Sequence, residues 1–194
     1  MAEPLADRII KGIDQAAGLY HRLVILAAPA GAGKTAALQD VRERTSALLI
    51  NVNLELSRRM LDLTERQRAL QLPRLLAEIV GASAADLPAQ QSKAALQAGV
   101  VLLDNIELLF DLSLKQDPLR LLEGLSRNKT VVAAWSGEIR AEDRGLRVES
   151  IISDNSTPIT QSSSLYLVYA TPDHPEYKRY PVRDFLVVNP EAVA

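Results

Sequence analysis

The stretch Ala28-Pro29-Ala30-Gly31-Ala32-Gly33-Lys34-Thr35 has the spacing of a phosphate-binding P-loop, and it follows the apolar run LVILA. Small residues in its middle let the backbone turn tightly and direct N–H groups at phosphate oxygens. A helix that starts near Gly33 would add the positive end of its dipole. Lys34 would then reach the β- and γ-phosphates, and the Thr35 hydroxyl would bind Mg²⁺.

The pattern departs from the usual one at its first position, where Ala28 replaces glycine. That residue closes the turn out of a strand and need not touch phosphate, so we expect alanine to be tolerated. The alternative interpretation is a glycine-rich turn before an ordinary helix, with Lys34 in solvent. On the P-loop interpretation the residues that bind ATP are Pro29, Ala30, Gly31, Ala32, Gly33, Lys34, Thr35 and Ala36.

The composition is that of an ordinary folded domain. The chain has 194 residues, 47% hydrophobic and 24% charged, with a formal net charge of −2. We expect one domain over 1–194, with an amphipathic helix in 1–21 and a tail in 171–194. The charge gives no global attraction to nucleic acid, so DNA contact would need a local patch. No cysteine is present for disulfides, and no long apolar run occurs, which predicts a cytoplasmic chain without a membrane span.

Apolar runs alternate with segments of helical spacing, which predicts an α/β protein with a three-layer P-loop NTPase fold and a mostly parallel five-stranded sheet. Loop-like composition separates some of these segments, at 153–158 and 161–164, and 82–99 is expected to hold a loop and a short helix rich in alanine and glutamine. About 25 residues follow the last expected strand, so we expect no helical lid domain. The expected strands are 22–28, 47–52, 100–104, 130–135 and 165–169. The expected helices are 5–20, 33–44, 54–63 with Asn53 as its cap, 72–80 with Pro73 in its first turn, 117–126 and 139–152.

Asp104 ends an apolar strand and is the candidate second Mg²⁺ ligand, because ligands of open α/β sheets bind at the carboxyl ends of strands. The alternative is an aspartate that caps the next turn. Many ATPases carry an acid directly afterwards, but here that position is Asn105, whose amide cannot accept a proton. Glu107 is then either the general base or a surface acid, unless hydrolysis is slow or a partner completes the site. Ser136 is either a γ-phosphate sensor or an ordinary turn serine.

Arginines on either side of the fourth expected strand are candidates to stabilise the transferring phosphoryl group, in the same protomer or from a neighbour. We favour Arg144 and Arg147 over Arg127 and Arg140, although a solvated helix face explains each of them individually. The segment 55–74 carries five arginines against three acids, and 177–180 interleaves tyrosines with bases. Both segments are weak indications of nucleic-acid or acidic-partner binding, and a charged surface and a packed tail are the simpler explanations.

Several segments together resemble the BrxF family, the small P-loop proteins of type 3 BREX bacteriophage-exclusion systems. These segments are 51–59, 102–110, 113–119, 125–130, 174–177 and 180–181. The resemblance implies a role in bacterial anti-phage defence beside other BREX proteins. It also implies nucleotide and Mg²⁺ roles for Lys34, Thr35 and Asp104, and it makes Asn105 part of the family's own pattern. The sheet pattern further resembles the additional-strand ATPases, which include the AAA+ group.

The expected function is therefore an ATP- and Mg²⁺-binding component of a BREX system that self-associates, with slow or partner-stimulated hydrolysis. Without a lid, a neighbouring subunit or partner would cover the nucleotide. Two alternatives stay open, a small-metabolite kinase and an adaptor that binds nucleotide without turnover. Phosphate release with and without acceptor molecules separates the three.

Overall fold

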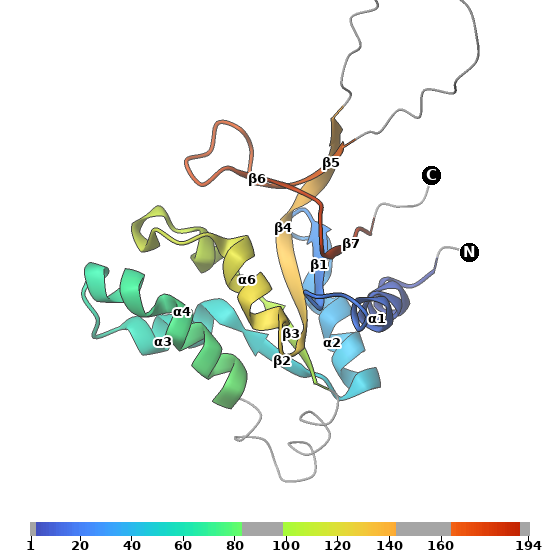
Figure 1. The fold of residues 1–194 in the computed structure, drawn as a ribbon, viewed down its shortest axis with the longest axis horizontal. Helices are drawn as coiled ribbons and strands as arrows, with labels where there is room; N and C mark the ends of the chain where they lie inside the picture. Colours follow the sequence, from blue (N-terminus) through green and yellow to red (C-terminus); the bar gives the residue numbers. More distant parts are fainter. Residues whose placement is uncertain (1–2, 83–98, 143–163, 191–194) are drawn as a thin grey trace, which may run out of the picture.

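The computed structural model describes residues 3–82, 99–142 and 164–190. Five parallel strands form the centre of the molecule, in the spatial order β2-β3-β4-β1-β7 (Figure 1). Two further strands pair antiparallel beyond β4, which confirms an α/β fold with a mostly parallel sheet. The strands are β1 (Leu23–Ala28), β2 (Leu48–Asn51), β3 (Val100–Asp104), β4 (Thr130–Glu142), β5 (Ser164–Tyr169), β6 (Lys178–Pro181) and β7 (Leu186–Val188).

Helices cover both faces of the parallel strands (Figure 1). Side chains alternate across a strand, so Val24 and Leu26 of β1 pack under one helical layer while Leu23, Ile25 and Ala27 pack under the other. None of the described helices is long and apolar enough to cross a membrane. One layer contains α1 (Leu5–Ala16) and α2 (Lys34–Thr45). The other contains α3 (Val52–Met60), α4 (Glu65–Ala82), the 3₁₀ turns η1 (Glu107–Phe110) and η2 (Leu112–Leu114), and α6 (Pro118–Ser126).

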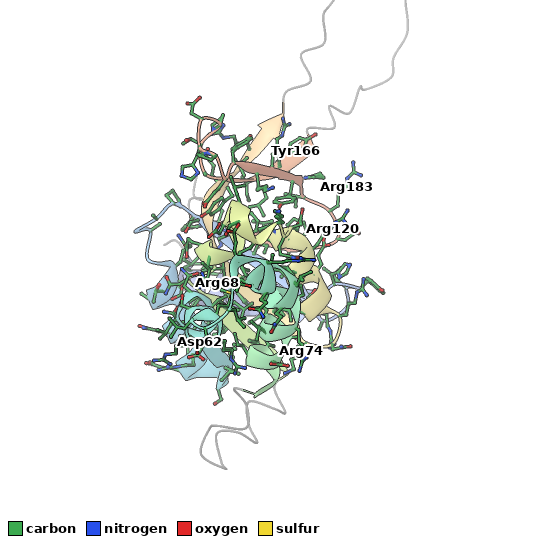
Figure 2. All side chains as sticks on the ribbon, turned by 90° about the vertical axis from the view of Figure 1, so that its left-hand side faces the viewer. Asp62, Arg68, Arg74, Arg120, Tyr166 and Arg183 are labelled. Atoms are coloured by element: carbon green, nitrogen blue, oxygen red, sulfur yellow. The ribbon has the colours of Figure 1, made fainter. Side chains whose placement is uncertain are left out.

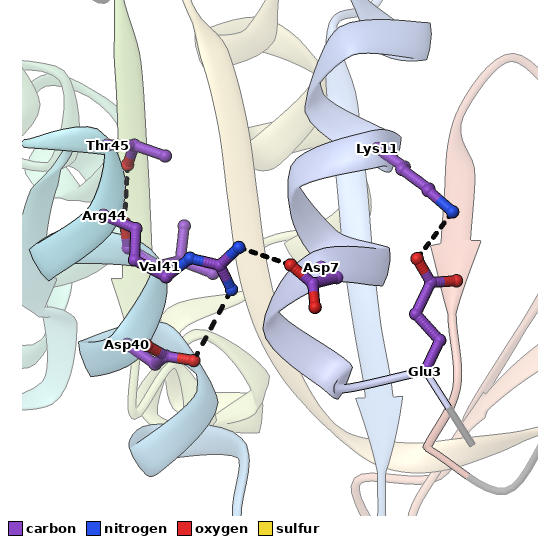
Figure 3. A network of polar contacts seen from close by, with 7 residues as sticks. All are labelled: Glu3, Asp7, Lys11, Asp40, Val41, Arg44 and Thr45. Atoms are coloured by element: carbon purple, nitrogen blue, oxygen red, sulfur yellow. Dashed lines mark hydrogen bonds and ion pairs between the residues drawn. The ribbon is translucent and has the colours of Figure 1, made fainter. Parts of the chain in front are cut away.

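Charged side chains tie α1 to α2, the helix that begins with Lys34 (Figure 3). Arg44 of α2 donates a hydrogen bond to Asp7 of α1 and also lies 3.8 Å from Asp40 one turn earlier. Gly12 lets α1 approach the sheet closely, because a β-carbon at this position would lie 3.3 Å from Val24. The helix carrying the candidate phosphate-binding lysine is therefore held by α1 as well as by its own buried face.

Helix α4 starts at Glu65, so the prediction that Pro73 stands in a first turn is wrong. Proline lacks an N–H and normally leaves the carbonyl four residues earlier without its helical donor. Here that carbonyl belongs to Ala69, and it accepts a 2.8 Å hydrogen bond from the side-chain amide of Gln116. A partner 47 residues away therefore satisfies the group that the proline releases.

Replacing Gln116 with alanine is expected to lower the free energy of unfolding by about 1–2 kcal/mol, because the Ala69 carbonyl loses its donor. The cost should shrink in a Pro73→Ala background, where residue 73 supplies an N–H to the same carbonyl. Urea denaturation of the two single variants and the double variant measures this coupling. Equal costs of the Gln116 change in both backgrounds would contradict the explanation.

The segment 165–169 is a strand, but it is not the last core strand that the sequence predicts. It pairs antiparallel with residues 137–142, the far half of an extended β4, so the helix expected over 139–152 is wrong for residues 139–142. The fifth parallel strand is β7, which pairs with β1 and lies in the segment expected to be a tail. Its three residues are too few for a recognisable pattern. The expectations for residues 143–163, and for 83–98, fall outside the described residues.

Candidate functional site

The glycine-rich loop lies between the carboxyl end of β1 and the first turn of α2, and residues 29–33 are all exposed. Gly31 and Gly33 have φ of 80° and 78°, a region that side-chain-bearing residues rarely adopt. A β-carbon at either glycine would still meet nothing within 4 Å, so backbone conformation explains the two glycines. The first turn of α2 carries no acid, and its N-cap, Gly33, has no side chain. Its N–H groups can therefore donate to an anion.

Lys34 is the first residue of α2 and is 9% exposed. Its ammonium group donates hydrogen bonds to the carbonyl oxygens of Ala28, at 2.9 Å, and Pro29, at 2.8 Å. Burial lowers the pKa of Lys34, and the negative charges of Glu107 and Asp104 partly oppose that shift. The alternative interpretation, with Lys34 in solvent, is therefore wrong: the ammonium is bound to two backbone carbonyls and lies within electrostatic range of two carboxylates.

Asp104 is the last residue of β3 and is 6% exposed. One of its oxygens accepts the N–H of the adjacent residue, Asn105, at 3.0 Å, but no side chain caps the turn η1 that follows, so the alternative interpretation of Asp104 as a cap is not confirmed. A carboxylate has about four acceptor positions, so this bond leaves capacity for a further ligand. Asn105 itself has φ of 51°, a left-handed conformation in which asparagine is enriched. Backbone geometry therefore gives a reason for asparagine at this position.

Glu107 begins η1 and is half-buried, held by groups from two other elements. The Ser136 hydroxyl donates to Glu107 Oε1 at 2.7 Å, and the Asn53 side-chain amide donates to Oε2 at 3.3 Å. Ser136 lies inside the extended β4, in register with Ala28 of β1, and not after a strand end as predicted. The contacts therefore correct the interpretation of Glu107 as a plain surface acid and that of Ser136 as a turn serine.

Asn53 is the residue that the sequence interpretation missed. The sequence predicts Asn53 as the N-cap of α3, but the N-cap is Asn51, whose side chain accepts the N–H of Leu54 at 3.0 Å. Asn53 lies inside α3, and its backbone N–H donates to the carbonyl of Asn105 at 2.9 Å. Its side chain also accepts the N–H of Leu108 at 2.8 Å. The sequence marks Asn53 as a polar residue shortly after an apolar run and as part of the segment 51–59 that carries the family resemblance.

Stacked aromatic rings support η1 from the antiparallel strands. Phe110 of η1 stacks on Tyr169 of β5 with ring centroids 3.4 Å apart, and Trp135 of β4 meets Phe110 edge-on at 4.9 Å. Burial, together with the charges of Glu176 and Glu107, raises the pKa of Tyr169 to about 12. Tyr169 is therefore a neutral phenol near the Glu107 carboxylate at physiological pH.

The structure does not bring the described candidate arginines to this site. Arg127 precedes the amino end of β4, and its carbonyl accepts a 3.2 Å hydrogen bond from Arg22, whereas the site lies at the carboxyl ends of the strands. Arg140 belongs to the antiparallel half of β4 and donates to Glu138 at 2.6 Å. The two favoured candidates, Arg144 and Arg147, lie outside the described residues.

The arginines of 55–74 mostly make internal contacts on the α3–α4 side, which faces the viewer in Figure 2. Arg68 donates to the carbonyls of Met60 and Leu63 and so caps the end of α3. Three others form ion pairs, which favours the charged-surface interpretation of this segment. These pairs are Arg58 with Glu55 at 3.0 Å, Arg59 with Glu78 at 3.7 Å and Arg74 with Glu78 at 2.7 Å.

The carboxyl ends of neighbouring strands thus gather the glycine loop, Lys34, Asp104, Glu107 and Ser136. Thr35 and Ala36 lie exposed in the first turn of α2, beside the loop. Comparisons with models of protein families, with curated proteins and with solved structures found no match to this chain. The functional argument therefore rests on the site itself.

Proposed function

We propose that this chain is a P-loop NTPase that binds ATP with Mg²⁺ at the glycine-rich loop. The observation that carries the proposal is the placement of Lys34. Its buried ammonium donates to the carbonyls of Ala28 and Pro29, at the start of the exposed glycine loop, and lies within electrostatic range of Asp104 and Glu107. On this proposal the lysine leaves the carbonyls of Ala28 and Pro29 to contact the β- and γ-phosphates, while the loop and first-turn N–H groups bind phosphate oxygens.

The residues present suit Mg²⁺ as the companion ion. It prefers oxygen ligands and is commonly held by one or two protein groups together with substrate phosphates. Thr35 offers an exposed hydroxyl and Asp104 a carboxylate with remaining acceptor capacity. When bound, the ion would neutralise charge on the phosphates. The described residues contain no cluster of three or more metal-ligating side chains, so a dedicated protein cage is not what we propose.

Calorimetric titration of the purified chain with ATP and with GTP, each with and without Mg²⁺, tests this proposal. We expect a single site with Mg²⁺-dependent affinity for the triphosphate. Phosphate release measured with and without small-molecule acceptors then separates the NTPase from a kinase and from an adaptor without turnover. Absence of any nucleotide binding in calorimetry would overturn the assignment.

We propose slow turnover with Glu107 as the group that orients and deprotonates water, since Asn105 cannot accept a proton. Both oxygens of Glu107 already accept hydrogen bonds, which fixes the carboxylate's direction while leaving lone pairs for water. We expect the isolated chain to release phosphate below the roughly 1 to 10³ s⁻¹ range of typical enzymes.

Replacing Glu107 with glutamine is expected to lower kcat by about 10²- to 10⁴-fold and to leave ATP affinity unchanged. Glutamine keeps the size of the side chain and can still accept from Ser136, but it cannot take a proton from water. Phosphate release and calorimetry on the same preparation measure the two quantities. Glu65→Gln, at an exposed acid of α4, is the matched control. A Glu107→Gln variant with parental kcat would exclude this residue as the base.

For the biological setting we propose a component of a type 3 BREX defence system that self-associates when it binds nucleotide. Support for this comes from the resemblance of the segments 51–59 and 102–110, which include Asn53, Asp104, Asn105 and Glu107. A neighbouring copy could supply the arginine that the described part of one protomer does not bring to the site. Sedimentation of the chain with and without ATP and Mg²⁺ tests the association directly.

A further inference from the structure

Asn53 makes three hydrogen bonds to one short segment, residues 105–108, which follows Asp104 and includes the start of η1. Its backbone N–H binds the carbonyl of Asn105, its side-chain oxygen binds the N–H of Leu108, and its side-chain amide binds Glu107. Two of these contacts use the side chain in opposite senses, as acceptor and as donor. Asparagine can make both at once, because its oxygen and its NH₂ group point in different directions.

The donor contact closes a polar chain across three neighbouring strands. Ser136 of β4 donates to Glu107, which follows β3, and Glu107 accepts from Asn53, which follows β2. Among the described residues, Lys34 of α2 and Tyr169 of β5 interact electrostatically with Glu107, and Asp104 acts on the same lysine. Of the groups named here that act on Glu107, Asn53 is the one that belongs to α3.

We propose that Asn53 is a positioning residue for the Glu107 carboxylate: it fixes the carboxylate's direction through its amide and the start of η1 through its oxygen. This inference rests on the proposed function, because it assigns Asn53 a role in the reaction of that site. Asn53 would act through Glu107 and would not contact the nucleotide.

The decisive variant is Asn53→Asp, which has the same size and separates the two side-chain contacts. A carboxylate oxygen still accepts the N–H of Leu108, so the turn keeps its support. The group facing Glu107 changes from a donor to a second carboxylate, and two carboxylates that share a site raise the pKa of one of them. The matched control is Asn128→Asp, the same change at an exposed turn residue two positions before the amino end of β4, away from the site.

With the full chain, we expect Asn53→Asp to lower kcat about 100-fold, with an unchanged KM for ATP. The acidic limb of the kcat–pH profile should move upward by on the order of one pH unit. Asn53→Ala should show a smaller upward movement, because it removes the donor and adds no charge. Asn128→Asp should match the parent in both measurements.

Carboxyl ¹³C NMR titration of Glu107 gives a readout that does not require turnover. The titration midpoint should increase in the order parent, Asn53→Ala, Asn53→Asp, and Asn128→Asp should leave it unchanged. If the parent chain releases no phosphate but the midpoints follow this order, the proposed turnover fails while the contact stands. Parental kcat and midpoint in Asn53→Asp, or an equal effect of Asn128→Asp, would overturn the inference. If the aspartate variant does not fold, Asn53→Ala decides the question.

Discussion

Replacing Lys34 with methionine is expected to weaken binding of ATP with Mg²⁺ by about 100-fold. Methionine keeps an apolar stem in the space that the lysine stem fills but removes the ammonium. Hydrogen bonds to charged groups contribute about 1.5–3 kcal/mol each, and every 1.4 kcal/mol is a factor of ten in affinity. Calorimetric titration of the variant and the parent measures the change.

The control for this experiment is Lys129→Met. Lys129 is half-buried and donates to a backbone carbonyl, that of Val80 at 3.1 Å, but it directly precedes the amino end of β4, away from the glycine loop. Its replacement should leave ATP affinity at the parental value. The Lys34 variant should keep its free energy of unfolding within about 1 kcal/mol, because the lost carbonyl contacts are offset by removing a buried ammonium. Parental affinity in this variant would remove Lys34 from the site.

The features that the sequence predicts correctly are set by neighbouring residues. The continuous apolar runs at 23–28 and 100–104 form strands buried along their length, and Asp117 with Pro118 marks the start of α6. The glycines of the loop adopt positive φ within a few residues of the strand that precedes them. Such patterns can be predicted because their physical cause is local.

The features that the sequence does not predict depend on contacts between distant residues. Pro73 stands inside a helix because Gln116, 47 residues away, binds the carbonyl that the proline releases. The strand β7 consists of three residues and exists through its pairing with β1. In the site, Asn53 and Glu107 are 54 residues apart, so no local pattern links them. The extension of β4 likewise depends on its pairing with β5.

Gly137 marks the point where β4 passes from the parallel sheet to the antiparallel strands, and its replacement by alanine is expected to destabilise the fold by at least about 3 kcal/mol. A β-carbon at this position would lie 1.8 Å from the carbonyl oxygen of Val168 and 2.9 Å from its carbonyl carbon. Those atoms belong to backbone, and the same oxygen accepts the indole N–H of Trp135 at 3.1 Å. The clash cannot be relieved by turning a side chain, so β5 must move away from β4.

Urea denaturation followed by tryptophan fluorescence measures this effect, because Trp135 is the single tryptophan of the chain and contacts the displaced strand. Gly124→Ala in α6 is the matched control, since a β-carbon there meets nothing within 4 Å and alanine favours the helix by about 1 kcal/mol over glycine. Moving β5 also displaces Tyr169 from Phe110, and Gly137 directly follows Ser136, which binds Glu107. A folded Gly137→Ala chain should therefore lose phosphate release as well, whereas parental stability and turnover would show that β5 does not support the site.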